Sequence, residues 1–155
     1  MIGGRLLALA AERQIYGDCM AEGLTCLILA GGLGTRLRPF TYHTPKCLID
    51  VEGRPFLDCQ LELLAKSGVK SAVMSTGYLG HKIEDYMGSH STHGVSVRIS
   101  HEKEQLGTGG SIIYSLPLLS DEFLLIYGDG YLLQPFAPVR EAFRKSGKQA
   151  LMTVL

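Results

Sequence analysis

Three glycines close the first strongly apolar run of the chain, in the stretch Leu29-Ala30-Gly31-Gly32-Leu33-Gly34-Thr35-Arg36-Leu37-Arg38-Pro39. The apolar run itself, residues 24–30, is typical of a buried strand. Glycine lets the backbone approach a ligand closely and adopt positive φ, so several N–H groups can converge on one anion. Residues 31–49 contain no acidic side chain, whereas Arg36, Arg38 and Lys46 are cationic. The stretch therefore predicts a polyphosphate-binding loop at the end of a buried strand.

The composition and charge of the chain limit what it can be. Its 155 residues, 46% hydrophobic and 19% charged, are typical of one globular domain with a buried core. The formal net charge is zero, so no overall field attracts nucleic acid or an anionic membrane, and we expect neither as a partner. The four cysteines show no C-x-x-C spacing, which favours free thiols over a zinc site or a disulfide framework. The apolar run at residues 6–11 is too short to span a membrane, and we expect a cytoplasmic protein.

Apolar runs and helical patterns alternate along the rest of the chain. The clearest helix is expected at residues 56–67, where Leu57, Leu61 and Leu64 form one apolar stripe and Gly68 ends the pattern. Strands are expected at 24–30, 69–76, 95–100, 122–127 and 149–155, and further helices at 80–87, 111–116 and 135–146. This alternation predicts an α/β fold with a mostly parallel, Rossmann-like sheet and flanking helices.

Glycine-marked segments follow four of the expected strands. They occur at residues 31–36, 76–77, 107–110 and 128–129, and two of them carry charge, with Arg36 in the first and Asp129 in the last. Ligands of such sheets bind at the carboxyl ends of the strands. We therefore expect the four segments to line one crevice.

Two well-known phosphate-binding motifs do not match the glycine stretch. A Walker loop requires G-x-x-x-x-G-K-[ST], and no Lys-Ser or Lys-Thr pair follows these glycines. A dinucleotide fingerprint that starts at Gly32 would need a third glycine where Leu37 stands, and an acidic residue at the ribose position, which is missing. The pattern that remains is G-G-x-G-T-R-x-x-P, followed by Pro45-Lys46.

This pattern resembles the signature of the sugar-phosphate nucleotidyltransferases, the sugar-nucleotide pyrophosphorylases. The resemblance runs from about residue 25 to residue 155 and is carried by the stretch 29–39, Thr41, Pro45, Lys46, Leu48, Val51, Gly53, Pro55, Gly77, Tyr78, the turn 106–110 and Gly128-Asp129. The chain is most similar to the bacterial branch that transfers guanylyl or uridylyl groups to heptose-, mannose- or muramic-type sugar 1-phosphates. The resemblance implies the nucleotide-diphospho-sugar transferase type of fold and a role in nucleotide-sugar biosynthesis for cell-envelope polysaccharides.

The reaction that the resemblance implies joins a nucleoside triphosphate and a sugar 1-phosphate into a nucleotide sugar and releases pyrophosphate. Arg36 and Lys46 would steady the phosphates and the departing pyrophosphate, and Asp129 would bind Mg²⁺. An assembly of identical subunits is left open. The implied nucleotide-binding residues are Leu29, Ala30, Gly31, Gly32, Gly34, Thr35, Gly77, Glu102, Gln105, Gly107 and Thr108, with Glu102, Gln105 and Gly107 as candidates for the base or ribose.

The chain also departs from the family pattern. Cys47 stands where another proline is common, and Gly130 stands where a small hydroxyl residue is common. Family members normally continue further, with a second metal-binding aspartate and a lysine for the sugar phosphate, so the resemblance implies a copy truncated at its carboxyl end. The expected organisation is an extension of uncertain order at residues 1–23, for which a short helix at 5–15 is the alternative, and the nucleotide-binding half at 24–155.

Two other functions stay open at this point. A non-catalytic nucleotide-binding or regulatory domain would keep the pocket without completing the reaction. The joint presence of Arg36, Lys46 and Asp129 favours the enzyme, whereas the missing acceptor half favours the binding domain. A molybdenum-cofactor or isoprenoid-type nucleotidyltransferase shares the glycine loop, but Thr44-Pro45-Lys46 and the turn 107–110 argue against it.

Overall fold

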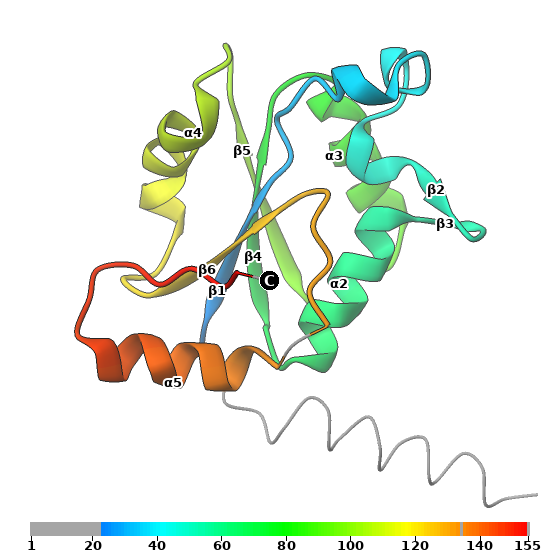
Figure 1. Cartoon of the computed structure of the whole chain (residues 1–155). Coiled ribbons are helices and arrows are strands. Elements are labelled where there is room, and N and C mark those ends of the chain that lie inside the picture. Colours follow the sequence, from blue (N-terminus) through cyan, green and yellow to red (C-terminus); the bar gives the residue numbers. More distant parts are fainter. Residues whose placement is uncertain (1–22, 134, 155) are drawn as a thin grey trace, which may run out of the picture.

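The computed structural model describes residues 23–133 and 135–154 of the chain (Figure 1). Its strands are β1 (Thr25–Leu29), β2 (Asp50–Val51), β3 (Arg54–Pro55), β4 (Ser71–Thr76), β5 (Ser96–His101) and β6 (Phe123–Tyr127). Its α-helices are α2 (Phe56–Lys66), α3 (Gly80–Ser89), α4 (Gly107–Ser115) and α5 (Phe136–Ser146). The 3₁₀ helices η1 (Thr35–Leu37), η2 (Phe40–Tyr42), η3 (Lys46–Leu48) and η4 (Leu116–Leu118) lie in the connections.

Four parallel strands form the sheet, in the order β5-β4-β1-β6. The first strand lies in the middle, where Leu27 pairs with Val73 of β4 on one side and with Leu125 of β6 on the other. The expected α/β fold with a mostly parallel sheet is thereby confirmed. Strands β2 and β3 form a separate antiparallel ribbon beside α2.

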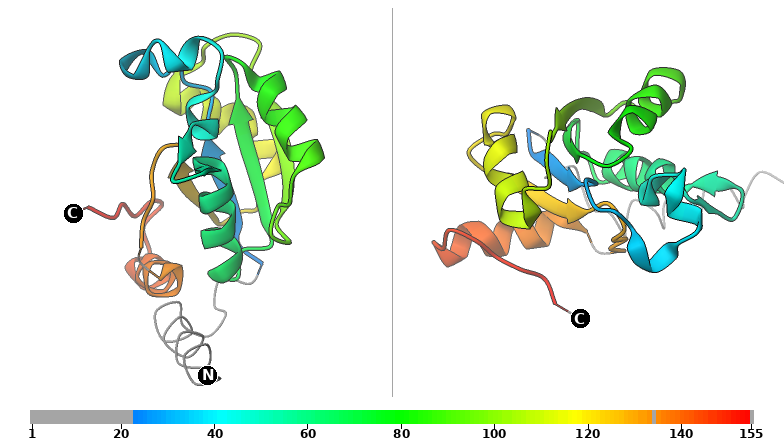
Figure 2. Two further views of the ribbon diagram at one scale, coloured as in Figure 1. Left: turned by 90° about the vertical axis from the view of Figure 1, so that its right-hand side faces the viewer. Right: turned by 90° about the horizontal axis from the view of Figure 1, so that it is seen from above.

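Alternate residues of the central strands face two different layers of helices. Cys26 and Ile28 of β1 belong to the main core cluster, together with the Leu57, Leu61 and Leu64 stripe of α2. Ile83 of α3 joins the same cluster. Helix α4 contacts β1 and β4 from the opposite face, as the view from above shows (Figure 2). The hydrophobic stripe predicted for residues 56–67 is therefore a core face.

The strand order places a topological switch point between β1 and β6. From β1 the chain moves outward through β4 to β5, and then returns to the other side of β1 to form β6. Open α/β sheets bind their ligands just outside the carboxyl ends of the strands at such a point. The segments after Leu29 and Tyr127 therefore lie where the fold favours a site, and α5 lies at the opposite end of the strands (Figure 1).

Two predicted elements differ from the structure. The strand expected at 149–155 is wrong for its described residues, because 149–154 pair with no strand and Met152 and Val154 are each 83% exposed. An apolar β pattern forms a strand only where a neighbour supplies hydrogen bonds. The helix expected at 111–116 begins earlier, at Gly107, because the glycines of 107–110 form its first turn, and η4 with Pro117 follows it. Residues 1–22 lie outside the described part, so the extension stays a prediction.

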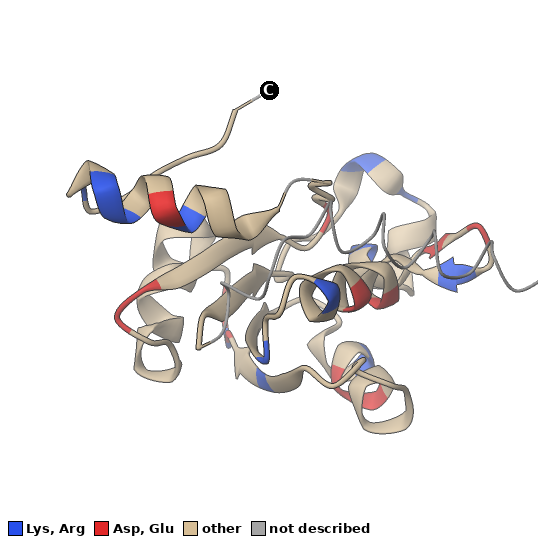
Figure 3. Cartoon of the chain, turned by 90° about the horizontal axis from the view of Figure 1, so that it is seen from below, with Lys and Arg blue, Asp and Glu red and all other residues tan. Residues whose placement is uncertain are grey.

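Charged side chains are interspersed along the surface helices. Figure 3 shows both basic and acidic residues on α2 and on α5. Arg54, just before α2, forms an ion pair with Asp58 of that helix, and Lys145 pairs with Glu141 within α5. Among the described helices, none is long and apolar enough to cross a membrane.

Candidate functional site

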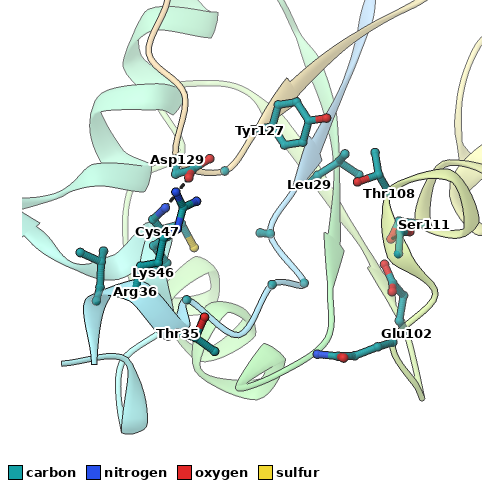
Figure 4. Close-up of a pocket in the computed structure, with 18 residues that line it drawn as sticks. Leu29, Thr35, Arg36, Lys46, Cys47, Glu102, Thr108, Ser111, Tyr127 and Asp129 are labelled. Carbon is teal, nitrogen blue, oxygen red and sulfur yellow. Dashed lines mark hydrogen bonds and ion pairs between the residues drawn. The ribbon is translucent and has the colours of Figure 1, made fainter. Parts of the chain in front are cut away.

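A cavity of about 620 Å³ lies at the carboxyl ends of β1 and β6. The loop after β1 forms its floor, the turn after β6 and η3 form one wall, and α4 with the segment before it forms the other (Figure 4). The structure thus brings three of the four glycine-marked segments to one cavity. Its lining includes every predicted site residue except Gly77: Leu29, Ala30, Gly31, Gly32, Gly34, Thr35, Arg36, Lys46, Glu102, Gln105, Gly107, Thr108 and Asp129.

The glycine loop needs its last glycine for conformational reasons. Gly34 has φ of 61°, and a Cβ added there would lie 2.8 Å from Thr41 Cγ2. The Thr41 hydroxyl donates a hydrogen bond of 2.8 Å to the Gly34 carbonyl, which fixes the loop against η2. A Cβ added at Gly32 would meet nothing within 4 Å. The open space at Gly32 belongs to the cavity, where a ligand can approach the backbone closely.

Gly77 does not line the cavity, and its role in nucleotide binding stays a prediction. A Cβ added at Gly77 would lie 3.3 Å from the Gly31 carbonyl oxygen, because the segments that follow β4 and β1 pass close to each other here. Gly77 therefore contacts the glycine loop from behind. This close backbone approach by itself accounts for a glycine at position 77.

Two cations and one carboxylate lie on the wall below the turn after β6. Arg36 lies in η1 and Lys46 begins η3, and the Lys46 ammonium forms an ion pair with Asp129 Oδ2 (Figure 4). The Lys46 and Asp129 side chains are 32% and 43% exposed, so both can be reached by a ligand. Next to them, burial raises the pKa of the Cys47 thiol to about 12, which keeps this thiol protonated and unreactive.

The turn that carries Asp129 is fastened by several hydrogen bonds. The Gly128 N–H donates to the Leu29 carbonyl at 2.8 Å, and the Gly130 N–H donates to the Tyr127 carbonyl at 2.9 Å. A Cβ at Gly128 would lie 2.8 Å from the Leu29 oxygen, so only glycine fits there. The side-chain amide of Gln60, on α2, donates to the carbonyls of Tyr127 and Gly130 at 2.9 and 2.7 Å.

The opposite wall carries a buried carboxylate. Glu102 is 6% exposed, and its Oε1 accepts a hydrogen bond from the buried Ser75 hydroxyl of β4. Its Oε2 accepts a long hydrogen bond of 3.4 Å from the Leu106 N–H, just before α4 begins. Gly107 starts α4 with φ of 68°, and its carbonyl accepts a hydrogen bond of 2.7 Å from the Ser111 hydroxyl. This wall presents acceptors and small side chains, in contrast to the cationic wall across the cavity.

Sequence reasoning missed several lining residues. They are Leu37, Cys47, Ser111, Tyr127 and Gly128. Gly128 and Tyr127 precede Asp129 in the same turn, so the turn could have predicted that they line the cavity. Ser111 follows one helical turn after Gly107, and this signal was lost because the helix was expected to begin only at residue 111.

The Asp129 carboxylate in the cavity is compatible with Mg²⁺ binding. No group of three or more His, Cys, Asp or Glu side chains is placed to hold a metal within the described part of the chain. Mg²⁺ needs no such cage, since one or two carboxylates, substrate phosphates and water complete its octahedral shell. Asp129, exposed beside the glycine loop, is compatible with that mode, and its carboxylate pairs with the Lys46 ammonium.

Comparison with known proteins agrees with this geometry. A family model described as nucleotidyl transferase matches residues 25–155. The mannose-1-phosphate guanylyltransferase catalytic subunit beta of Xenopus tropicalis is 36% identical over 135 residues, covering 84% of this chain and 38% of its own length. The N-acetylmuramate alpha-1-phosphate uridylyltransferase of Neisseria meningitidis is 41% identical over 108 residues, covering 68% of this chain and 47% of its own length.

A solved structure matches as well. The crystal structure of HddC from Yersinia pseudotuberculosis, also solved in complex with GMP-PN, superposes with a TM-score of 0.72 at 33% identity. The match covers 77% of this chain and 53% of that chain. The chain therefore spans about half the length, or less, of the proteins it matches. The sheet order, the glycine loop and the family model agree, and the chain belongs to the nucleotidyl transferase family.

Proposed function

We propose that this protein transfers a nucleotidyl group from a nucleoside triphosphate to a sugar 1-phosphate, giving a nucleotide sugar and pyrophosphate. One observation carries the proposal: the structure gathers the glycine loop, Arg36, Lys46 and Asp129 around one cavity at the switch point of the sheet. Polyphosphate binding accounts for the converging backbone, the two cations and the exposed carboxylate together. Both named relatives act on sugar 1-phosphates, which supports the acceptor class.

The chemistry follows from charge and position. A phosphate oxygen of the sugar 1-phosphate attacks the α-phosphorus, a new P–O bond forms, and the bond between the α-phosphorus and the bridging oxygen breaks to release pyrophosphate. Such a transfer requires alignment and neutralisation of negative charge more than covalent participation of the protein. The backbone of residues 31–35 holds the triphosphate, the Arg36 guanidinium binds phosphate oxygens in a fork, and Lys46 adds a point charge near the leaving group.

Asp129 is the residue that would hold Mg²⁺ with the triphosphate. A bound Mg²⁺ would supply charge neutralisation at the phosphate oxygens. In the free protein the Asp129 carboxylate pairs with Lys46. With Asp129 holding Mg²⁺, the neighbouring Lys46 ammonium would contact the phosphates. Asp129 would thereby hold Lys46 at the site until the substrate arrives.

The wall formed by Glu102, Gln105, Gly107 and Thr108 would hold the nucleobase and ribose. Buried acceptors can select hydrogen-bond donors on a base edge, and the small residues at the start of α4 leave room for a planar ring. The Glu102 carboxylate is held in place by Ser75, so it faces the cavity in a fixed orientation. Transfer of guanylyl or uridylyl groups by the relatives supports a base with such donors.

We further propose a cytoplasmic location and a role in the supply of sugars for cell-envelope polysaccharides. The muramate relative supports the second point. The described cysteines Cys26, Cys47 and Cys59 are free, which supports a reducing compartment. Self-association into identical subunits stays a proposal that sedimentation of the purified chain would test.

Calorimetry with GTP, UTP, dTTP, CTP and ATP, each with and without Mg²⁺, tests the proposal directly. We expect binding of at least one triphosphate, stronger with Mg²⁺, and loss of that gain in an Asp129→Asn variant. Release of pyrophosphate after addition of sugar 1-phosphates then separates a transferase from a domain that only binds nucleotide. Absence of heat with all five triphosphates would overturn the proposal.

A further inference from the structure

We infer that Gln60 is a positioning residue that holds the Asp129 carboxylate in the geometry needed for metal and triphosphate. The inference rests on the proposed function, because it concerns the same site. Gln60 does not line the cavity. It lies on α2, is 1% exposed, and is nevertheless a polar residue within the leucine-rich face of that helix.

Gln60 bridges the two ends of the turn that carries Asp129. The Tyr127 carbonyl accepts from the Gly130 N–H at 2.9 Å, so residues 127–130 form a β-turn with Gly128 and Asp129 at its centre. The Gln60 amide donates one hydrogen bond to the first carbonyl of this turn and one to the last, at 2.9 and 2.7 Å. Both sides of the turn are thus tied to one buried side chain.

The chemistry of the contact requires an amide rather than a carboxylate. Both partners are carbonyl oxygens, so the NH₂ group must face them, because oxygen cannot donate. Gln60 Oε1 has no hydrogen-bond partner in the part of the chain that the structure describes. A buried acceptor without a partner is costly. The NH₂ group of this amide is thus bonded to the turn while its oxygen is left without a partner, which favours a role at the turn over a role in core packing.

Gln60 acts on Asp129 through the backbone. Gly128 and Gly130 have no side chains to restrict the turn, and the Asp129 side chain is 43% exposed, so its own packing does not fix it. The Tyr127 and Gly130 carbonyls belong to the two peptide units that flank residues 128–130, so fixing both carbonyls limits the movement of the segment that carries Asp129. Metal ligands held in place by neighbouring hydrogen bonds bind their metal more tightly.

The test compares Gln60→Met with the unmodified 155-residue chain. Met matches the length and volume of Gln without its donors, and the Tyr127 carbonyl keeps its bond from Gly130. Calorimetry measures triphosphate affinity in Mg²⁺ and in EDTA. We expect the affinity in EDTA to stay within about threefold and the gain from Mg²⁺ to fall by about tenfold or more.

A double-mutant cycle separates positioning from packing. If Gln60 acts through Asp129, Gln60→Met adds no further loss of the Mg²⁺ gain in an Asp129→Asn background. Leu63→Ala serves as the matched control: Leu63 lies on the same helix and is buried, so its loss destabilises the fold but leaves the Mg²⁺ gain. Amide exchange of Gly130, expected to speed up in Gln60→Met and in a second variant, Gln60→Leu, reports the loosened turn without ligand.

These measurements distinguish failure of the proposed function from failure of the role given to Gln60. An unmodified chain that binds no triphosphate, or gains nothing from Mg²⁺, refutes the proposed function. An unmodified chain with the Mg²⁺ gain, together with a Gln60→Met variant that keeps it, refutes the positioning role. Equal losses in EDTA and in Mg²⁺ also refute it, because they show a general loss of structure.

Discussion

At the scale of single residues, Gly34 and Gly32 line the same loop for different reasons. Gly34 needs positive φ and leaves no room beside Thr41, whereas Gly32 meets nothing. We expect Gly34→Ala to lower the free energy of unfolding by about 1–2 kcal/mol or more, from backbone strain alone. Gly32→Ala should change it by less than about 0.5 kcal/mol. Urea unfolding of the two variants measures the difference.

The two glycines also differ in what they do to a ligand. The methyl group of Gly32→Ala would project into the space that the triphosphate needs. We therefore expect weaker triphosphate binding from a variant that is as stable as the unmodified chain. Equal stability losses in both variants would contradict this account of the loop.

Lys46 is expected to matter for binding and little for stability. Its ion pair with Asp129 is partly exposed, and such pairs contribute about 0–1 kcal/mol. A charged contact with phosphate is stronger, so Lys46→Met should weaken triphosphate binding by about tenfold or more. Lys70→Met is the control, since Lys70 is exposed at the other end of β4. An equal effect of both variants on binding would indicate that only net charge matters.

At the scale of elements, α2 combines a core face with a charged face. On its outer face, Glu62 accepts a hydrogen bond from Arg54 at 2.5 Å and pairs with Lys66 at 3.1 Å. The hydrogen bond from Arg54, and then that from Lys66, lower the pKa of Glu62 below its unfolded value of 4.5. The unfolded state therefore binds the proton more readily, and the stabilisation is complete above pH 4.5 and lost as the pH falls through the lowered pKa.

The lowered pKa of Glu62 in the folded state can be tested with Glu62→Gln. We expect the variant to be less stable than the unmodified chain at pH 7, and the gap to close as the pH is lowered toward 3. Chemical unfolding at a series of pH values measures the gap. Glu104→Gln, at an exposed carboxylate in the loop before α4, is the control and should show a smaller gap. A gap that widens in acid would contradict the role given to Glu62.

The first turn of α4 shows how far sequence patterns reach at this scale. Glycines 107, 109 and 110 indicated a loop, because glycine has a poor intrinsic helix propensity. In the structure they lie in the first turn of α4, where the Ser111 hydroxyl bonds the Gly107 carbonyl and a Cβ at Gly110 would lie 2.7 Å from the Leu106 Cβ. Helix α4 packs against β1 and β4, and such tertiary contacts, which the local sequence does not show, can outweigh a poor helix propensity.

At the scale of the whole molecule, ligand binding should stabilise the fold. The cavity joins β1, β6 and α4, which are distant in sequence, so a ligand in it ties the sheet to its helices. At a free Mg²⁺–triphosphate concentration 100 times its Kd, mass action adds about 2.7 kcal/mol. For a chain of this size, that corresponds to a Tm increase of roughly 5–10 °C. Differential scanning calorimetry measures it, and an unchanged Tm with all five triphosphates would contradict the site.

The sequence predicted the parallel sheet and most of the cavity, because periodicity and glycine-marked strand ends are local signals. Arg36, Lys46 and Asp129 were predicted from the family resemblance, and the structure brings Lys46 and Asp129 into contact. The contacts of Gln60 with the turn 127–130 and of Gly77 with Gly31 could not be predicted, because they depend on which backbone segments meet in space. The strand expected at 149–155 failed for the same reason, since a strand depends on a neighbour that the local pattern does not contain.

The central position of β1 has a consequence for how the chain forms during synthesis. Strand β1 is made first, yet Thr25 must wait for Ser71 and then for Phe123 before both its edges are paired. On the ribosome, the unit from β4 to β5 can close early, whereas the glycine loop meets the Asp129 turn only after β6 has emerged. A nascent chain stalled before that point would expose an apolar strand edge to chaperones, and triphosphate binding would mark the completion of translation through Asp129.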